Sequence, residues 1–257
     1  SPEIDRFGGA TDLAGEVDAL KTKNPKMYGL AFSSKEIKAA DEDIAKYTTE
    51  AKEIAQKSEN VNWEFIHGRE GMKYKGYVPV DEDENPYPKS GVTIASGFDL
   101  GTKNRSDLRG LPISIIKKLM PYLKKKGVEA AKVADQLKVS KEEAEIINEF
   151  AKTKEVKKVI TIWEKETGTP FSDLDQEQAT VLVSVAYQHG ASFLTSKGKP
   201  MNFFKQAKAG NWRGVYNELM DFHDGHQTRR RKEAALLLKS LMLTDKPSPN
   251  DLIQEKM

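Results

Sequence analysis

The chain contains no cysteine among its 257 residues. This absence excludes thiol nucleophiles, cysteine-ligated zinc sites and disulfide bonds. It leaves the redox compartment open, because such a chain needs no oxidising conditions to fold and loses nothing on meeting them. The protein is therefore neither a disulfide scaffold nor a thiol enzyme.

Long apolar runs and an excess of one charge are also missing. The longest apolar runs, such as residues 179–187, are far shorter than the roughly 20 residues that cross a bilayer. The 41 Lys and Arg residues against 39 Asp and Glu residues leave a formal charge of +2, which is not by itself the footprint of a nucleic-acid-binding protein. The sequence therefore predicts no membrane insertion and no nucleic-acid partner.

Helical periodicity accounts for most of the chain. From Ser33 or Ser34, either of which is a candidate N-cap, apolar residues spaced by three or four predict an amphipathic helix of about 20 residues. This helix is an accessory element packed on the main domain or, alternatively, a linker or partner-docking segment. The same signals predict helices over 113–123, with Pro112 in the first turn, over 130–137, and from a Ser140–Glu143 capping box through Phe150.

Residues 62–101 interrupt this pattern with glycine, proline, tyrosine and alternating apolar residues, which favours short strands and turns. The predicted fold class is therefore α+β and mostly helical. We expect an accessory or linker segment at 1–60, a main domain at 61–243 with a β-rich lobe at 62–101 and a helical lobe at 102–243, and a tail at 244–257.

The β-rich segment holds three residues with the properties of a catalytic set. Glu70 follows Phe65 and Ile66, and apolar neighbours raise the pKa of a carboxyl, as a proton donor near neutral pH requires. Asp99 lies between glycines, where backbone donors and water would keep it charged. Thr93 belongs to an alternating segment that fits a hairpin packed on one side, with Thr93 facing away from its apolar neighbours. These features suggest that Glu70 and Asp99 form an acid and base pair. The alternative is that both are ordinary surface carboxylates.

The order and local sequence of these residues resemble the catalytic segment of the pesticin family, bacteriocin and effector domains related to phage T4-type lysozyme. The matching stretches are Glu70-Gly, Ser90-Gly-Val-Thr-Ile and Gly97-Phe-Asp-Leu-Gly. The resemblance implies a lysozyme-like fold, in which a small β-rich catalytic lobe lies next to a larger helical lobe. It also implies a muramidase that cuts the β-1,4 bond between N-acetylmuramic acid and N-acetylglucosamine, without a cofactor. Glu70 would be the general acid, and Asp99 with Thr93 would hold and deprotonate the attacking water, which predicts inversion.

The second half of the chain adds weaker similarities to T4-type lysozymes. Residues 178–190 resemble their buried lobe helix, residues 211–219 the helix that follows, and residues 229–236 their C-terminal helix, so the resemblance extends over roughly residues 60–243. It makes Tyr87, Gln188 and Arg230 candidate substrate-binding residues. For Arg230, packing next to Glu233 and plain surface charge stay open as alternatives.

Two further patterns resemble metal sites only superficially. His189, His223 and His226 do not supply a preorganised set of zinc ligands. Residues 81–85 begin like a calcium loop, but the glycine and the closing glutamate of an EF-hand are missing. We expect no metal site, and an exposed acidic loop at 81–85.

Two rival functions stay open beside the hydrolase. A non-catalytic peptidoglycan- or receptor-binding module would keep a lysozyme-like groove but would have lost the acid. A lytic transglycosylase would use the acid alone and form a 1,6-anhydro product without water. The presence of Glu70, Thr93 and Asp99 together favours the hydrolase over both.

The start of the chain bears on its delivery. It is polar, has no signal-peptide pattern and begins with Ser1 rather than Met, so we expect a processed or excised piece of a longer protein. Pesticin-like domains occur in bacteriocins, type VI secretion effectors and phage-derived enzymes. The resemblance implies secretion or delivery to the periplasm of a target bacterium and action as a monomer on peptidoglycan glycan strands. An immunity protein and a secretion or import machinery are the further partners it implies.

Overall fold

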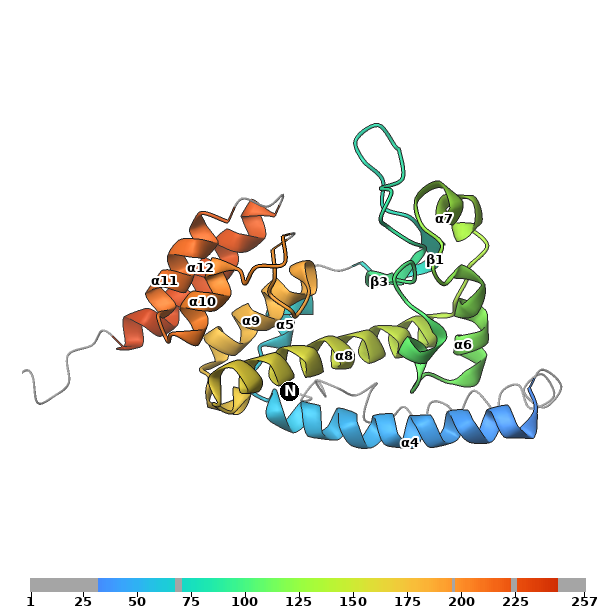
Figure 1. Ribbon diagram of the computed structural model, residues 1–257, viewed down its shortest axis with the longest axis horizontal. Coiled ribbons are helices and arrows are strands. Elements are labelled where there is room, and N and C mark those ends of the chain that lie inside the picture. The colour runs from blue at the N-terminus through green and yellow to red at the C-terminus, as the bar shows by residue number, and fades with distance from the viewer. Residues whose placement is uncertain (1–31, 68–70, 196, 223–225, 245–257) are drawn as a thin grey trace, which may run out of the picture. The chain divides into compact units, whose positions relative to one another are not determined.

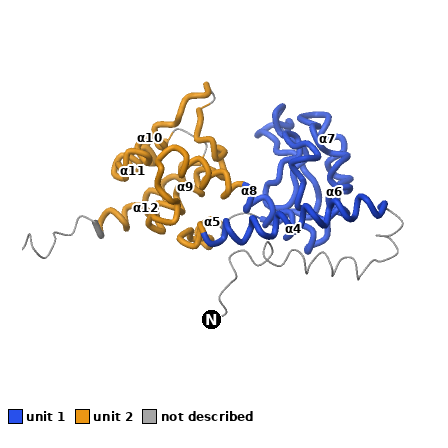
Figure 2. The backbone as a smooth tube through the Cα atoms, turned by 60° about the horizontal axis from the view of Figure 1, so that its bottom comes forward, with its two compact units in different colours: residues 1–56, 69–154 blue, residues 57–68, 155–257 orange. Residues whose placement is uncertain are grey.

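The computed structural model describes residues 32–67, 71–195, 197–222 and 226–244. These residues are mostly helical and include one small three-stranded sheet (Figure 1), which confirms the predicted α+β class. The chain divides into two compact units, one from residues 1–56 and 69–154 and the other from residues 57–68 and 155–257 (Figure 2). The predicted main domain takes residues from both units, and its outer boundaries stay a prediction.

The first unit contains α4, which spans Ser34–Lys57. The Ser33 hydroxyl accepts a hydrogen bond from the Glu36 backbone N–H (3.2 Å), and the Glu36 carboxylate accepts one from the Ser33 N–H (3.0 Å). This capping box makes Ser33, rather than Ser34, the N-cap. The predicted amphipathic helix is confirmed, and its buried stripe consists of Ala40, Ile44, Tyr47, Ala51 and Ile54.

The sheet of the first unit has the order β1-β2-β3 with antiparallel neighbours, so β2 is its central strand. Helix α7 packs against β1, where a Cβ on Gly76 would lie 2.4 Å from the Ala134 carbonyl oxygen. Pro112 is the N-cap residue of α6, one position before the first turn in which we expected it. The elements are β1 Lys73–Tyr77, β2 Thr93–Ala95, β3 Phe98–Asp99, η1 Arg105–Leu108, α6 Ile113–Leu119, η2 Met120–Tyr122 and α7 Gly127–Ala134.

Helix α8 spans Lys141–Thr167 and begins at the predicted capping box. The Ser140 hydroxyl accepts a hydrogen bond from the Glu143 N–H (3.1 Å), and the Glu143 carboxylate accepts one from the Ser140 N–H (2.8 Å). The boundary between the two units falls inside this helix, after Lys154. Local sequence therefore determines where α8 begins, as it does for α4.

The second unit is built around α9, whose residues Ala179–Ala186 are all buried, as expected for the buried lobe helix. Helix α9 packs against α5 and α12, α12 packs against α11, and α11 packs against α10. None of the helices in the described part of the chain is long and apolar enough to span a bilayer. The remaining elements of this unit are α5 Trp63–His67, η3 Phe171–Asp173, α9 Gln176–His189, α10 Asn202–Lys208, α11 Trp212–Met220 and α12 Gln227–Thr244.

Candidate functional site

Thr93 and Asp99 face each other across the hairpin formed by β2 and β3. The two residues are direct partners in the antiparallel register, and Ile94 pairs with Phe98 next to them. Directly opposed residues of an antiparallel pair place their side chains on the same face of the sheet. The structure thus contains the predicted hairpin and brings two of the three predicted catalytic residues together.

The Asp99 carboxylate is half-buried and is held by backbone donors. Its Oδ1 atom accepts hydrogen bonds from the Gly91 N–H (3.1 Å) and the Gly101 N–H (2.7 Å), as its position between glycines suggested. Its Oδ2 atom accepts no hydrogen bond from any described residue. One oxygen of the carboxylate is therefore fixed by two backbone donors, and among the described residues no hydrogen-bond donor reaches the other.

A close approach of two glycine backbones makes this arrangement possible. A Cβ on Gly91 would lie 2.2 Å from the Gly101 nitrogen and 2.5 Å from Asp99 Oδ1, and a Cβ on Gly101 would lie 2.6 Å from the Gly91 Cα. No other residue fits either position without displacing backbone. Sequence reasoning recognised the glycines around Asp99 but assigned no role to Gly91, because the contact joins positions ten residues apart.

Thr93 is more deeply buried than the sequence suggested. It is 3% exposed, and its hydroxyl donates a hydrogen bond to the Gly91 carbonyl oxygen (3.1 Å). All three residues of β2 are buried, so the expectation of a hairpin packed on one side only is wrong for this strand. Strand β2 is the central strand of the sheet, and Val92 just before it packs near Gly76.

Glu70, the predicted acid, lies outside the described residues, as do residues 68 and 69. Of the apolar residues before it, Ile66 is buried and Phe65 is partly buried at the end of α5. The separation of Glu70 from Asp99, and with it the inverting geometry, stays a prediction.

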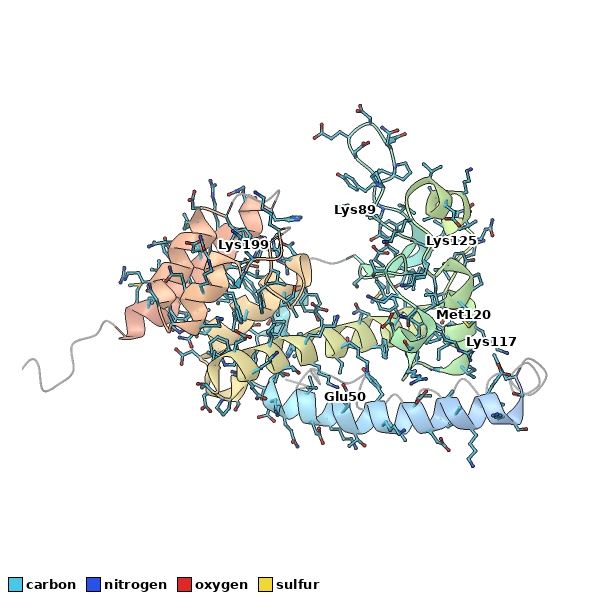
Figure 3. All side chains as sticks on the ribbon, viewed as in Figure 1. Glu50, Lys89, Lys117, Met120, Lys125 and Lys199 are labelled. Carbon is cyan, nitrogen blue, oxygen red and sulfur yellow. The ribbon has the colours of Figure 1, made fainter. Side chains whose placement is uncertain are left out.

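Tyr87 belongs to the long loop between β1 and β2 and is 49% exposed. This loop extends from the sheet, and Lys89 lies near its base (Figure 3). At the tip, Asp81 Oδ1 accepts hydrogen bonds from the backbone N–H groups of Asp83 (3.0 Å) and Asn85 (2.8 Å). The acidic segment is thus an exposed turn, and Tyr87 is accessible for contact with a ligand.

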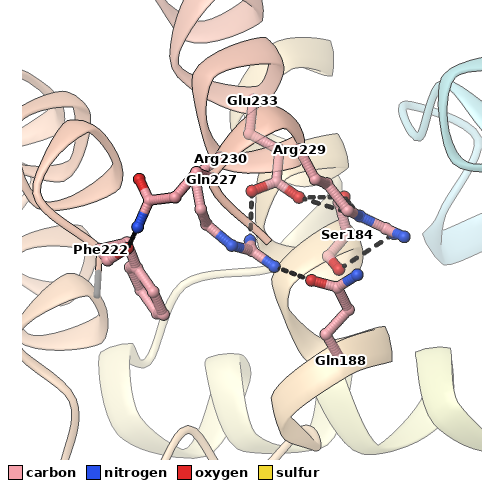
Figure 4. Close-up of polar contacts among 7 residues, drawn as sticks. All are labelled: Ser184, Gln188, Phe222, Gln227, Arg229, Arg230 and Glu233. Carbon is pink, nitrogen blue, oxygen red and sulfur yellow. Dashed lines mark hydrogen bonds and ion pairs between the residues drawn. The ribbon is translucent and has the colours of Figure 1, made fainter. Parts of the chain in front are cut away.

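The second unit contains a buried polar cluster that joins α9 to α12 (Figure 4). We call it the Arg230 cluster, and it consists of Ser184, Gln188, Arg229, Arg230 and Glu233. Arg230 and Glu233 are both 0% exposed and form an ion pair. The Arg230 guanidinium also donates to the Gln188 side-chain oxygen and lies 5.1 Å from the centre of the Phe222 ring. The predicted pairing of Arg230 with Glu233 is confirmed.

The burial of Arg230 bears on its predicted role. Its side chain has no exposed surface and forms an ion pair with Glu233, which is a structural role, and contact with a saccharide stays a prediction. Gln188, by contrast, is partly exposed at the C-terminal end of α9. Burial raises the pKa of Glu233, while its contacts with Arg230, Ser184 and Arg229 act in the opposite direction.

Two members of the Arg230 cluster were missed by sequence reasoning. The Ser184 hydroxyl donates to Glu233, and Arg229 Nε donates to the Ser184 hydroxyl (3.2 Å) and to Glu233 Oε1 (3.4 Å). Ser184 lies four residues before Gln188, a spacing that places both on one face of α9. That spacing could have identified Ser184 as a neighbour of Gln188.

The candidate metal ligands do not assemble into a site in the described part of the chain. The His189 ring lies against the Phe222 ring, with 5.2 Å between their centres, and His223 lies outside the described residues. No group of three or more histidine, aspartate or glutamate side chains that could hold a metal ion occurs among the residues described.

Comparison with known proteins identifies the family. The family model for Pesticin, described as a bacterial toxin homologue of phage lysozyme, C-terminal, matches residues 60–213, more than half of the chain. The match includes Glu70, Tyr87, Thr93, Asp99 and Gln188 and ends before the Arg229–Glu233 segment. No curated protein matches the chain. With its helical fold, its small sheet and its Thr93–Asp99 hairpin within the matched region, the chain belongs to the pesticin family of bacterial toxin homologues of phage lysozyme.

Proposed function

We propose that this protein is a muramidase that hydrolyses the β-1,4 bond between N-acetylmuramic acid and N-acetylglucosamine in peptidoglycan. The observation that carries the proposal is the Asp99 carboxylate directly opposite Thr93, with one oxygen fixed by two backbone donors and no hydrogen bond from the described residues on the other. Membership of a lysozyme-like toxin family supports the same chemistry.

In the proposed mechanism, Glu70 protonates the oxygen of the leaving sugar. Asp99 Oδ2 accepts a proton from the water that attacks the anomeric carbon from the opposite face of the ring. Thr93 helps to hold that water, and the two glycine N–H donors keep the carboxylate of Asp99 in place. Because water attacks in a single displacement, the product has the inverted anomeric configuration.

Digestion of purified sacculi tests this proposal directly. Mass spectrometry of the released fragments should show reducing N-acetylmuramic acid ends, and NMR of the first product should show the inverted anomer. A 1,6-anhydro product would instead identify a lytic transglycosylase. Binding to sacculi without any released fragment would identify a non-catalytic binding module, and either result would overturn the proposal.

The variant Glu70→Gln tests the assignment of the acid. It should lower turnover by about 100- to 10,000-fold, the usual contribution of general acid catalysis, and leave the fold intact. Glu64→Gln is a matched control, since Glu64 is an exposed carboxylate on α5, and it should digest sacculi at the parent rate. Parent-like digestion by Glu70→Gln would show that another group supplies the proton.

We also propose that the protein acts as a monomer on glycan strands in the periplasm of a target bacterium. A secretion or import machinery would deliver it there, and an immunity protein would protect the producing cell. The purified protein should then clear chelator-permeabilised Gram-negative cells but not intact ones, as measured by turbidity. Rapid clearing of intact cells would contradict the need for a delivery partner.

A further inference from the structure

Gln188 has one side of its amide fixed and the other side open. Its side-chain oxygen accepts a hydrogen bond from Arg230, and its side-chain nitrogen donates to none of the described residues. A glutamine amide can turn over to present either its oxygen or its NH₂ group. With the oxygen held by a guanidinium, Gln188 presents two N–H donors from a partly exposed position.

The Arg230 guanidinium, which fixes Gln188, is itself held by several contacts. One arm of the Arg230 guanidinium donates to Glu233 Oε2, another donates to Gln188, and the group lies against the Phe222 ring. Glu233 Oε1 accepts hydrogen bonds from Ser184 and Arg229. The direction of the Gln188 amide is therefore set by a chain of contacts that begins on α12 in the interior of the unit (Figure 4).

Stability alone is a weak explanation for this chain of contacts. Buried ion pairs often contribute no more to stability than well-packed apolar side chains of similar size, because desolvation offsets their attraction. Arg230 and Glu233 are both fully buried and belong to this class. An orienting role explains the fork of Arg230, since a guanidinium can hold a carboxylate and an amide oxygen at the same time.

We propose that Arg230 and Glu233 are positioning residues, which turn the Gln188 amide so that its N–H donors meet a neutral oxygen acceptor of a bound glycan. Such an acceptor is a hydroxyl or an acetamido carbonyl oxygen. The choice of a glycan as the ligand rests on the proposed function. The orientation of Gln188 rests only on its contact with Arg230. Arg230 acts through Gln188 and touches no substrate.

The test combines glycan affinity with the order of the Gln188 amide. Affinity for a tetrasaccharide of alternating N-acetylglucosamine and N-acetylmuramic acid is measured in the Glu70→Gln background, so that the ligand is not consumed. Gln188→Ala should weaken binding about 2- to 12-fold, the equivalent of one neutral hydrogen bond. The double variant Arg230→Met/Glu233→Met should lose a similar factor, and adding Gln188→Ala to it should cause no further loss.

The control and the second variant separate positioning from folding. Lys239→Met/Glu177→Met removes another ion pair between α12 and α9, with the same net charge change, and should bind like its background. If the buried double variant does not fold, Arg230→Lys keeps the charge but loses the planar fork. It should retain a native melting profile while binding weakens and ¹⁵N relaxation shows a more mobile Gln188 side-chain amide.

The outcomes distinguish this inference from the proposed function. Unchanged affinity and an ordered Gln188 amide in the Arg230 variants would overturn the positioning role, and so would losses that multiply when Gln188→Ala is added. No glycan binding and no hydrolysis by the parent protein, with an ordered Gln188 amide, would overturn the proposed function and the sugar acceptor. The relaxation data would then still show that the Gln188 amide is ordered.

Discussion

Asp99 and Glu233 are carboxylates that each accept several hydrogen bonds, yet they lie in different units and in opposite surroundings. Asp99 is half-buried, its donors are backbone N–H groups, and only one of its oxygens is occupied by described residues. Glu233 is 0% exposed, its donors are side chains, and both of its oxygens are occupied. Asp99 is therefore suited to the base role proposed for it, whereas Glu233 has no exposed surface.

The source of the donors determines what a substitution does. Backbone N–H donors remain in place when a side chain changes, so the turn around Asp99 can keep its shape without the carboxylate. In the Arg230 cluster each charge is compensated by another side chain, and removal of one leaves its partner buried without a counter-charge. We therefore expect substitutions at Asp99 to affect activity and substitutions at Glu233 to affect stability.

The largest effect is expected for Asp99→Asn. The amide oxygen can still accept from the Gly91 and Gly101 N–H groups, but an amide cannot take a proton from water. Turnover of sacculi should fall by about 100- to 10,000-fold. The free energy of unfolding, measured with urea, should stay within about 1 kcal/mol of the parent value.

A matched control for Asp99→Asn is Asp107→Asn, since Asp107 is an exposed aspartate that caps η1 and belongs to the same unit. It should retain parent turnover. If Asp99→Asn digests sacculi at the parent rate, Asp99 is not the base. The two carboxylates would then not differ in catalytic role.

The second effect is expected for Glu233→Leu. The substitution leaves Arg230 buried without its carboxylate, which typically destabilises a protein by about 3–5 kcal/mol. Urea unfolding should show this loss, and the double variant Arg230→Met/Glu233→Leu should recover most of it. A loss below about 1 kcal/mol would mean that water or another group reaches Arg230, and the contrast with the accessible Asp99 would weaken.

Local patterns predicted the elements of the fold that depend on neighbours in sequence. The capping box at Ser140 identified the start of α8, and a candidate N-cap at Ser33 or Ser34 identified the start of α4 to within one residue, because such signals close within three residues. Alternation and the glycines identified the β2–β3 hairpin, whose partners Thr93 and Asp99 are six residues apart. The catalytic roles of these two residues, in contrast, rest on the family resemblance and the proposed mechanism.

Local sequence patterns could not predict features that depend on contacts between residues far apart in the chain. The burial of both faces of β2 depends on tertiary packing, and the role of Gly91 follows from its approach to Gly101. The burial of Arg230 depends on packing between α9 and α12, where Gln188 and Arg230 meet across 42 positions. A run of cations in the sequence does not reveal which one faces the interior.

The smallest effect is expected for Thr93→Val, which keeps the branched shape and removes the hydroxyl. Loss of the hydrogen bond to the Gly91 carbonyl should destabilise the protein by about 1 kcal/mol. Turnover should fall less than in Asp99→Asn, about tenfold, because a hydroxyl can position water without taking its proton. Thr93→Ser retains the hydroxyl and should keep most of the activity. Thr93→Val could instead lose as much turnover as Asp99→Asn while Thr93→Ser does not. The hydroxyl would then take part in proton transfer itself, and Asp99 alone could not be assigned as the base.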